Sequence, residues 1–81
     1  MILVDIQVPA IDRIYDFELD EEMPVGELIK EVTETIAQKE KMDYDKDDKM
    51  HLYAMWHECM LKDMYSLKSQ GIRNGERLIL M

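Results

Sequence analysis

Residues 2–8 carry a β-branched apolar side chain at every second position, which is the period of an extended strand with one buried face. Residues 9–13 begin with Pro9, which donates no backbone hydrogen bond, and they predict a turn. Residues 15–20 then alternate again, so the two segments predict a β-hairpin whose apolar side chains face the same way. The side chains expected on the buried side are Ile2, Val4, Ile6, Val8, Tyr15, Phe17 and Leu19.

The period changes after Pro24, where apolar residues recur at the spacing of one helical face. Pro24 suits the start of a helix, since the backbone N–H that it lacks would have no partner there. Glu27 and Lys39 lie near the ends of the helix dipole that favour their charges. Gly26 weakens a helix, and the pattern offers no reason for it. The face expected to pack on a sheet consists of Val25, Leu28, Ile29, Val32 and Ile36.

The second half of the chain has shorter periodic segments. Residues 42–49 are polar and rich in aspartate, which predicts a loop. Residues 50–57 alternate, which predicts a strand with Leu52, Ala54 and Trp56 on its buried side. The remaining features are a short strand around Met60 and Leu61, a helical turn at residues 66–68, and a turn at residues 72–76 in which Gly75 supplies a positive φ.

Residues 77–81 alternate once more and predict a last strand, with Leu78 and Leu80 facing the core. The predicted order is therefore strand, strand, helix, strand, short strand, strand. One helix packed on one mixed sheet of four to five strands buries one face of each and gives a two-layer α+β fold. Because no linker or repeat interrupts the pattern, we expect residues 1–81 to form a single domain.

The composition narrows the kind of partner. The chain has 81 residues, of which 47% are apolar, enough for the core of one small globular domain. Asp and Glu total 18 against 10 Lys and Arg, so the net charge is -8. An acidic chain without a basic run has nothing to displace the counterions of a nucleic acid, and an anionic membrane would repel it. A protein partner with a basic surface is therefore expected.

Three observations predict a cytoplasmic protein. Cys59 is the only cysteine, so nothing indicates a disulfide or an oxidising compartment. No apolar run approaches the roughly 20 residues that a membrane helix needs. The first residues lead directly into a strand without a basic segment, so no signal peptide is expected.

Two clusters of side chains have part of the pattern of a metal site. Asp43, Asp45 and Asp47 have the spacing of the first, third and fifth ligands of an EF-hand loop. That loop needs glycine at its sixth position and glutamate at its twelfth, where this chain has Asp48 and Ala54. We therefore expect residues 43–48 to be a solvated acidic loop that attracts a basic partner.

The second cluster is His51, His57 and Cys59, which would supply three zinc ligands where a tetrahedral site needs four. A Cys–His nucleophile pair is equally incomplete, because nothing in the chain supplies an orienting group or an oxyanion hole. We expect no metal, no cofactor and no catalytic residue, and therefore not an enzyme.

More specific information comes from the end of the chain, where residues 71–78 read GIRNGERL. The motif follows a Ser66-Leu67 pair, and the helix begins with Pro24-Val25. These features resemble the YukD/EsaB family of bacterial ubiquitin-like proteins. Apolar residues spaced more widely along the chain resemble the pattern of the ubiquitin fold. They are Leu19, Leu67, Ile72, Leu78 and Leu80.

The resemblance implies a ubiquitin-like β-grasp fold and a small cytosolic accessory or regulatory protein of a type VII (ESX-like) secretion system of Gram-positive bacteria. The same module also occurs fused to the cytosolic end of membrane components of that machine. A generic ubiquitin-like interaction module, or the detached domain of a larger protein, is the alternative that stays open.

The resemblance does not extend to conjugation. Conjugated ubiquitin-like proteins and sulfur carriers of this fold end in an exposed Gly-Gly tail. Here residues 78–81 are Leu-Ile-Leu-Met inside the last predicted strand, so we expect neither conjugation nor sulfur carriage. A chain that continued past Met81 to such a tail would change this expectation.

Alternation also predicts which apolar side chains face away from the helix. Tyr53 and Met55 lie opposite the buried side of their strand, and Ile79 and Met81 lie opposite Leu78 and Leu80. In ubiquitin the corresponding strands carry the main hydrophobic recognition patch. Eight methionines add to this, because methionine is an adaptable contact residue. We expect these four residues to bind a protein partner, such as a secretion-machinery component, or a second copy of the chain; the alternative is scattered exposed apolar residues. The partner's identity and the oligomeric state stay open.

Overall fold

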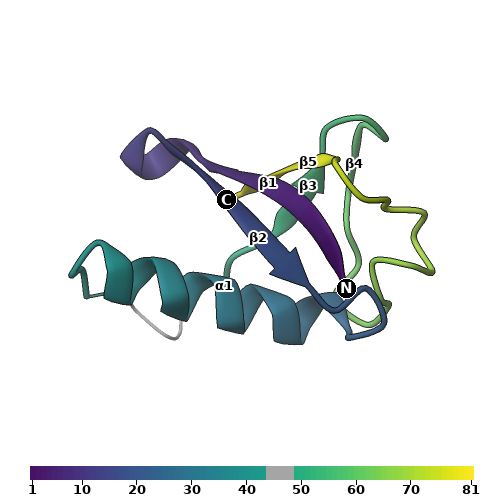
Figure 1. The fold of residues 1–81 in the computed structure, drawn as a ribbon, viewed down its shortest axis with the longest axis horizontal. Coiled ribbons are helices and arrows are strands. Elements are labelled where there is room, and N and C mark those ends of the chain that lie inside the picture. Colours follow the sequence, from purple (N-terminus) through teal and green to yellow (C-terminus); the bar gives the residue numbers. More distant parts are fainter. Residues whose placement is uncertain (44–48) are drawn as a thin grey trace.

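The structure, a computed structural model, describes residues 1–43 and 49–81. Within them the chain forms five strands, one α-helix and a single turn of 3-10 helix (Figure 1). The strands are β1 (Ile2–Val8), β2 (Arg13–Leu19), β3 (Leu52–Ala54), β4 (Cys59–Met60) and β5 (Arg77–Leu80). The 3-10 turn η1 is Pro9–Ile11, and the helix α1 is Val25–Lys39.

The strands form one mixed sheet in the order β2-β1-β5-β3-β4. β1 and β5 pair in parallel at its centre, and the other three pairs are antiparallel. α1 lies along one face of this sheet (Figure 1), so the predicted two-layer α+β architecture is confirmed, with five strands. No helix of the described residues is both long and apolar enough to cross a membrane.

The hairpin of β1 and β2 has the predicted orientation. Val4, Ile6 and Val8 are buried against α1, and Ile2 packs on the same core in a half-buried position. On β2, Leu19 is buried and the two aromatic side chains before it are partly covered. The turn between the strands is η1, and it ends with Asp12 at a φ of 52°.

α1 packs through the predicted face, all five residues of which are buried. The start of the helix also explains Gly26. Within residues 1–43 and 49–81 no side chain caps the start of α1; instead the N–H groups of Val25 and Gly26 donate to the carbonyls of Tyr65 and Asp63, at 2.9 and 3.0 Å. A Cβ atom on residue 26 would lie 3.3 Å from the Cβ of Asp63. Glycine therefore allows the backbone of residues 63–65 to approach closely enough to cap the helix.

The prediction for Trp56 is wrong: its side chain is 66% exposed. β3 ends at Ala54, and residues 55–58 form a turn in which the Glu58 N–H donates to the Met55 carbonyl at 3.3 Å. Glu58, the last residue of this turn, has a left-handed φ of 52°. The apolar alternation continues through residue 56, but the extended backbone does not.

The segment between β4 and β5 also differs in detail from its prediction. Hydrogen-bonded turns occupy residues 67–71 in place of a helical turn at residues 66–68. The short strand lies at Cys59–Met60, one residue earlier than predicted, so Leu61 follows it and is buried. Gly75 has the predicted positive φ, at 90°.

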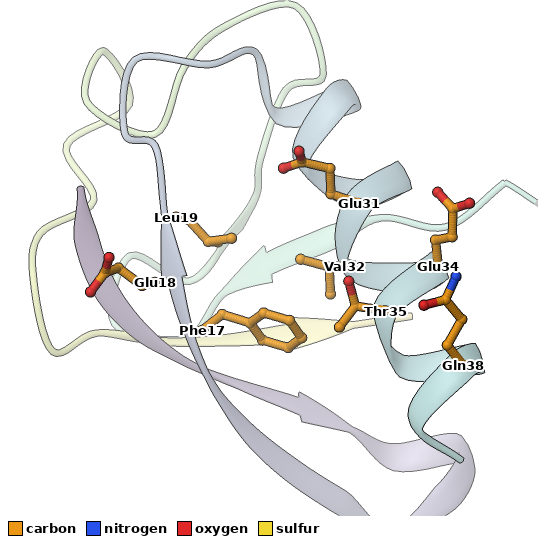
Figure 2. Close-up of a pocket in the computed structure, with 8 residues that line it drawn as sticks. All are labelled: Phe17, Glu18, Leu19, Glu31, Val32, Glu34, Thr35 and Gln38. Atoms are coloured by element: carbon orange, nitrogen blue, oxygen red, sulfur yellow. The ribbon is translucent and has the colours of Figure 1, made fainter. Parts of the chain in front are cut away.

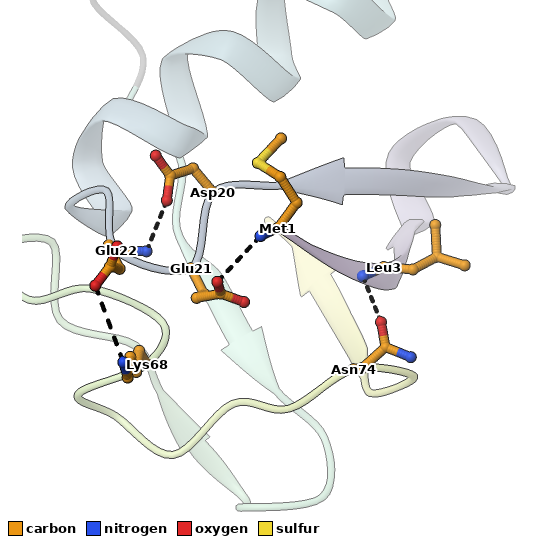
Figure 3. A network of polar contacts seen from close by, with 7 residues as sticks. All are labelled: Met1, Leu3, Asp20, Glu21, Glu22, Lys68 and Asn74. Carbon is orange, nitrogen blue, oxygen red and sulfur yellow. Dashed lines mark hydrogen bonds and ion pairs between the residues drawn. The ribbon is translucent and has the colours of Figure 1, made fainter.

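Polar contacts hold this segment to the rest of the molecule (Figure 3). The Asn74 Oδ1 accepts a hydrogen bond from the Leu3 N–H at 2.8 Å, beside β1. In the loop before α1, the Glu22 N–H donates to the Asp20 Oδ1 at 3.0 Å. The exposed Lys68–Glu22 pair, at 3.9 Å, adds little stability. The segment is therefore fixed by the hydrogen bonds that its backbone accepts from the start of α1 and by the contact of Asn74 with β1.

We predict that Leu28→Ala lowers the free energy of unfolding by about 2–5 kcal/mol, because this fully buried side chain leaves a cavity between α1 and the sheet. Urea denaturation measures the loss. The matched control is Lys30→Ala on the exposed side of the same helix, which should change the value by no more than about 0.5 kcal/mol. Equal midpoints for the two variants would contradict the packing described above.

Candidate protein-binding surface

The register of the sheet decides which side chains share the face opposite α1. Tyr53 pairs with Ile79 on one side and with Met60 on the other. Because paired residues lie on the same face, these three side chains form a row across β5, β3 and β4. His51 and Met81 exchange backbone hydrogen bonds at 2.6 and 2.9 Å, which continues the same register and places Met81 on this face.

We call Tyr53, Met60, Ile79 and Met81 the outer-face patch. Tyr53 and Ile79 are half-buried at its centre. Met60 and Met81 flank them and are 45% and 46% exposed. The patch is therefore a continuous apolar surface on the side of the sheet that α1 does not cover.

Three of the four predicted contact residues lie in this patch. The fourth, Met55, lies at its border, where its N–H donates to the Arg77 carbonyl at 3.3 Å in the turn after β3. Met60 was missed, because alternation within one segment cannot give the register of a two-residue strand against its neighbour. The exposed Trp56 was also missed, because it lies in the turn after β3 and not in the strand.

Charged residues border the patch on β1 and β2. Asp5 and Asp16 are directly opposite each other, and Arg77 pairs with Asp5 on the other side, with 3.6 Å between Nη2 and Oδ2. A hydrogen bond to the Asp5 carboxyl and repulsion by its charge, with some loss of solvation, raise the pKa of Asp16 above its ordinary value of 3.8. This half of the outer face is acidic.

A buried carboxylate holds the turn between β3 and β4. Glu76 is 3% exposed and its Oε2 accepts a hydrogen bond from the Arg73 N–H at 2.9 Å. The Nε2 of His57 lies 3.2 Å from Oε2 and 2.9 Å from Oε1. Among the described residues Oε1 has no aligned hydrogen-bond donor, so the hydrogen bond of His57 runs to Oε2. The pair ties the turn that carries Trp56 to the turn before β5.

The three candidate zinc ligands lie in separate contacts. His51 pairs with Met81, His57 contacts Glu76, and Cys59 is exposed on β4. The part of the chain that the structure describes contains no group of three His, Cys, Asp or Glu side chains that would hold a metal ion. Of the acidic loop, residues 44–48 lie outside the described residues. The expectation of no calcium site there stays a prediction.

A helix across one face of a mixed sheet with parallel central strands, and an apolar patch on the other face, define a ubiquitin-like β-grasp domain. The ubiquitin-like domain of EccD5 from Mycobacterium xenopi has a TM-score of 0.73 to this chain at 21% identity, covering 99% of this chain and 91% of that one. The ubiquitin-like domain of the Mycobacterium tuberculosis type VII secretion system protein ECCD1 has a TM-score of 0.71 at 17% identity, covering 100% and 99%.

A third similar structure is the MycP5-free ESX-5 inner membrane complex, with a TM-score of 0.73 at 16% identity. The match covers 99% of this chain and 20% of the chain in that complex. At these identities the likenesses establish the fold, and they confirm the predicted ubiquitin-like class.

The family follows from sequence. The family model described as protein YukD of the WXG100 protein secretion system (Wss) matches residues 3–80. The chain therefore belongs to the YukD family, as the GIRNGERL motif indicated. No curated protein matches it in sequence.

We predict that Asp16→Asn raises the urea midpoint at pH 7, because it removes repulsion between two opposed carboxylates. The pKa of Asp16 is higher in the folded protein than in the unfolded chain, so its contribution to stability falls as the pH rises from 3.8 through the folded-state pKa. The gain should disappear at pH 3, below the raised pKa of Asp16, where this carboxyl is protonated in wild type. Glu18→Gln, opposite the apolar Leu3, is the control, and an equal gain from it would contradict the explanation.

Proposed function

We propose that this chain is a cytosolic, non-catalytic and non-conjugating accessory or regulatory protein of a type VII (ESX-like) secretion system, and that residues 1–81 act as one protein-binding domain. The match of residues 3–80 to the YukD family is the observation that carries this proposal. The ubiquitin-like domains of EccD5 and ECCD1, which have the same fold, support it.

The outer-face patch supports binding as the mode of action. Apolar side chains from β3, β4 and β5 are continuous there, and a soluble domain that exposes such a surface commonly uses it as an interface. Tyrosine at the centre of an interface is often a binding hot spot, and methionine at the rim adapts to the partner's shape. The net charge of -8 favours a basic protein over a nucleic acid or an anionic membrane.

One observation favours a second arrangement. In the ESX-5 inner membrane complex, the similar segment is one fifth of a longer chain. The same fold thus serves as part of a membrane component, and a domain of a larger protein is the alternative function. Genes for small WXG-type secreted proteins and an FtsK-like ATPase beside a short reading frame would favour the free accessory protein. A reading frame that continues into membrane-spanning segments would favour the alternative.

We predict that Tyr53→Ala combined with Ile79→Asp leaves the fold intact, because both side chains face away from α1 and are only half-buried. Affinity for the cytosolic domains of the secretion components encoded beside it should fall at least about 30-fold, the equivalent of one hot spot of 2 kcal/mol. Calorimetric titration measures the affinity, and light scattering measures any self-association.

Lys30→Ala, on the far side of the helix, is the matched control and should bind like wild type. If the folded double variant bound every partner with unchanged affinity, the outer-face patch would not be the interface.

A further inference from the structure

β2 is an edge strand, and among the described residues no strand pairs with its outer side. On the neighbouring strand β1, the Leu3 carbonyl accepts a hydrogen bond from the Gly75 N–H at 2.7 Å, and the Asp5 N–H donates to the Glu76 carbonyl at 3.0 Å. The backbone groups of Leu3 and Asp5 therefore point toward β5. Backbone groups alternate sides along a strand, and the even-numbered residues of β1 therefore bond to β2. Their partners are the odd-numbered residues of β2. The residues that direct their N–H and C=O groups to the open edge are Ile14, Asp16 and Glu18.

Two grooves run beside this edge, between β2 and α1. The larger, of about 450 Å³, extends from Phe17 to Leu19 and is closed on the other side by residues 31–38 of α1. The smaller, of about 370 Å³, extends from Ile14 to Phe17. Figure 2 shows the Phe17 ring pointing from β2 toward Val32 and Thr35, while Glu18 points away from the helix. A strand added to this edge would place alternate side chains in the grooves.

The charges around the edge select the occupant. Asp16 and Glu18 lie on the outer face, and Glu31 and Glu34 line the larger groove. The cations at the other end already contact the chain itself: Lys39 lies 5.4 Å from the Tyr15 ring centroid, and Arg13 lies 3.6 Å from Glu40. A second copy pairing through its own β2 would bring the same carboxylates together. The edge therefore opposes self-pairing and favours a basic strand.

We propose that the edge of β2 binds an extended segment of a partner protein in which apolar residues alternate with Lys or Arg, and that this segment becomes the sixth strand of the sheet. Its backbone pairs with Ile14, Asp16 and Glu18. Its apolar side chains enter the grooves beside Phe17, and its basic side chains lie on the outer face near Asp16 and Glu18. A cation there also relieves the repulsion between Asp5 and Asp16.

This site is separate from the outer-face patch. β1 lies between β2 and β5, and the polar Gln7 lies between Ile14 and Ile79 in the register. Loss of binding at one surface therefore leaves the other intact. The Tyr53→Ala and Ile79→Asp double variant should bind the β2 probe like wild type, so the two proposals fail independently.

The probe is an acetylated and amidated seven-residue peptide, Lys-Val-Lys-Val-Lys-Val-Lys, titrated into the full chain and followed by NMR. We expect a dissociation constant below about 1 mM that increases with salt concentration. Amide hydrogen exchange should slow at least about tenfold at Ile14, Asp16 and Glu18, because each amide gains a carbonyl partner. The same peptide with Glu in place of Lys should not bind. No binding of the lysine peptide at 5 mM, or protection at Tyr53 and Ile79 instead, would overturn the proposal.

Two N-methylated peptides test strand addition without changing the protein. In antiparallel pairing the lysine N–H groups face β2, and in parallel pairing the valine N–H groups do. Methylation of one set should therefore weaken binding at least tenfold, while methylation of the other set leaves it within about twofold. Equal effects of the two would show that the peptide binds by charge alone and would refute the added strand.

A variant of the protein tests the same backbone hydrogen bonds from the side of β2. Asp16→Pro removes one outward N–H and no bond to β1, which proline tolerates on an edge strand. It should weaken binding at least tenfold, whereas Asp16→Asn, which keeps the N–H, should weaken it only a few-fold. Equal losses in the two variants would point to the charge and against the strand.

Discussion

The parallel pairing of β1 with β5 is the interaction on which the rest of the structure depends. It joins segments near the opposite ends of the chain, with Ile6 beside Leu78 at the centre, and neither side chain is exposed. β2 joins the sheet through β1, and β3 and β4 join it through β5. The entropy cost of closing so long a loop grows only slowly with its length, and the buried central pair offsets it. A one-residue slip would turn the buried face of β5 outward.

The same register gives the exposed side of the sheet two chemically different halves. On β3, β4 and β5 the outward side chains of Tyr53, Met60 and Ile79 are apolar and form the outer-face patch with Met81, while Arg77 at the start of β5 pairs with Asp5. On β1 and β2 the outward positions include Asp5, Asp16 and Glu18, so this half is acidic and repels a copy of itself. A single sheet can thus offer an apolar surface to one partner and a backbone edge to another, because side-chain contacts serve the first and hydrogen bonds serve the second.

Local periodicity predicted the elements whose neighbours are close in sequence. It gave the buried faces of β1, β2 and α1, since in these a residue's environment follows from its position in a regular backbone. It failed for Trp56 because β3 ends at Ala54 and the turn at residues 55–58 follows, although the apolar alternation continues. It could not explain Gly26, whose reason is the distant Asp63, or place Met60, whose face depends on a pairing across a turn. These depend on contacts between segments, which a one-dimensional pattern does not contain.

The motif that indicated the family acts through this central pairing. Gly71 and Gly75 have φ values of 82° and 90° and turn the chain into β5. Asn74 accepts the Leu3 N–H beside β1, Glu76 is buried under the turn after β3, and Leu78 enters the core. These five residues of the motif thus place β5 beside β1, and none lies in the outer-face patch or on the edge of β2. The motif therefore identifies the family through its fold, and in both binding proposals the residues that contact the partner lie outside it. A shared motif therefore does not by itself fix the partner, and the side chains on β2 and on β3 to β5 are the positions at which to compare family members.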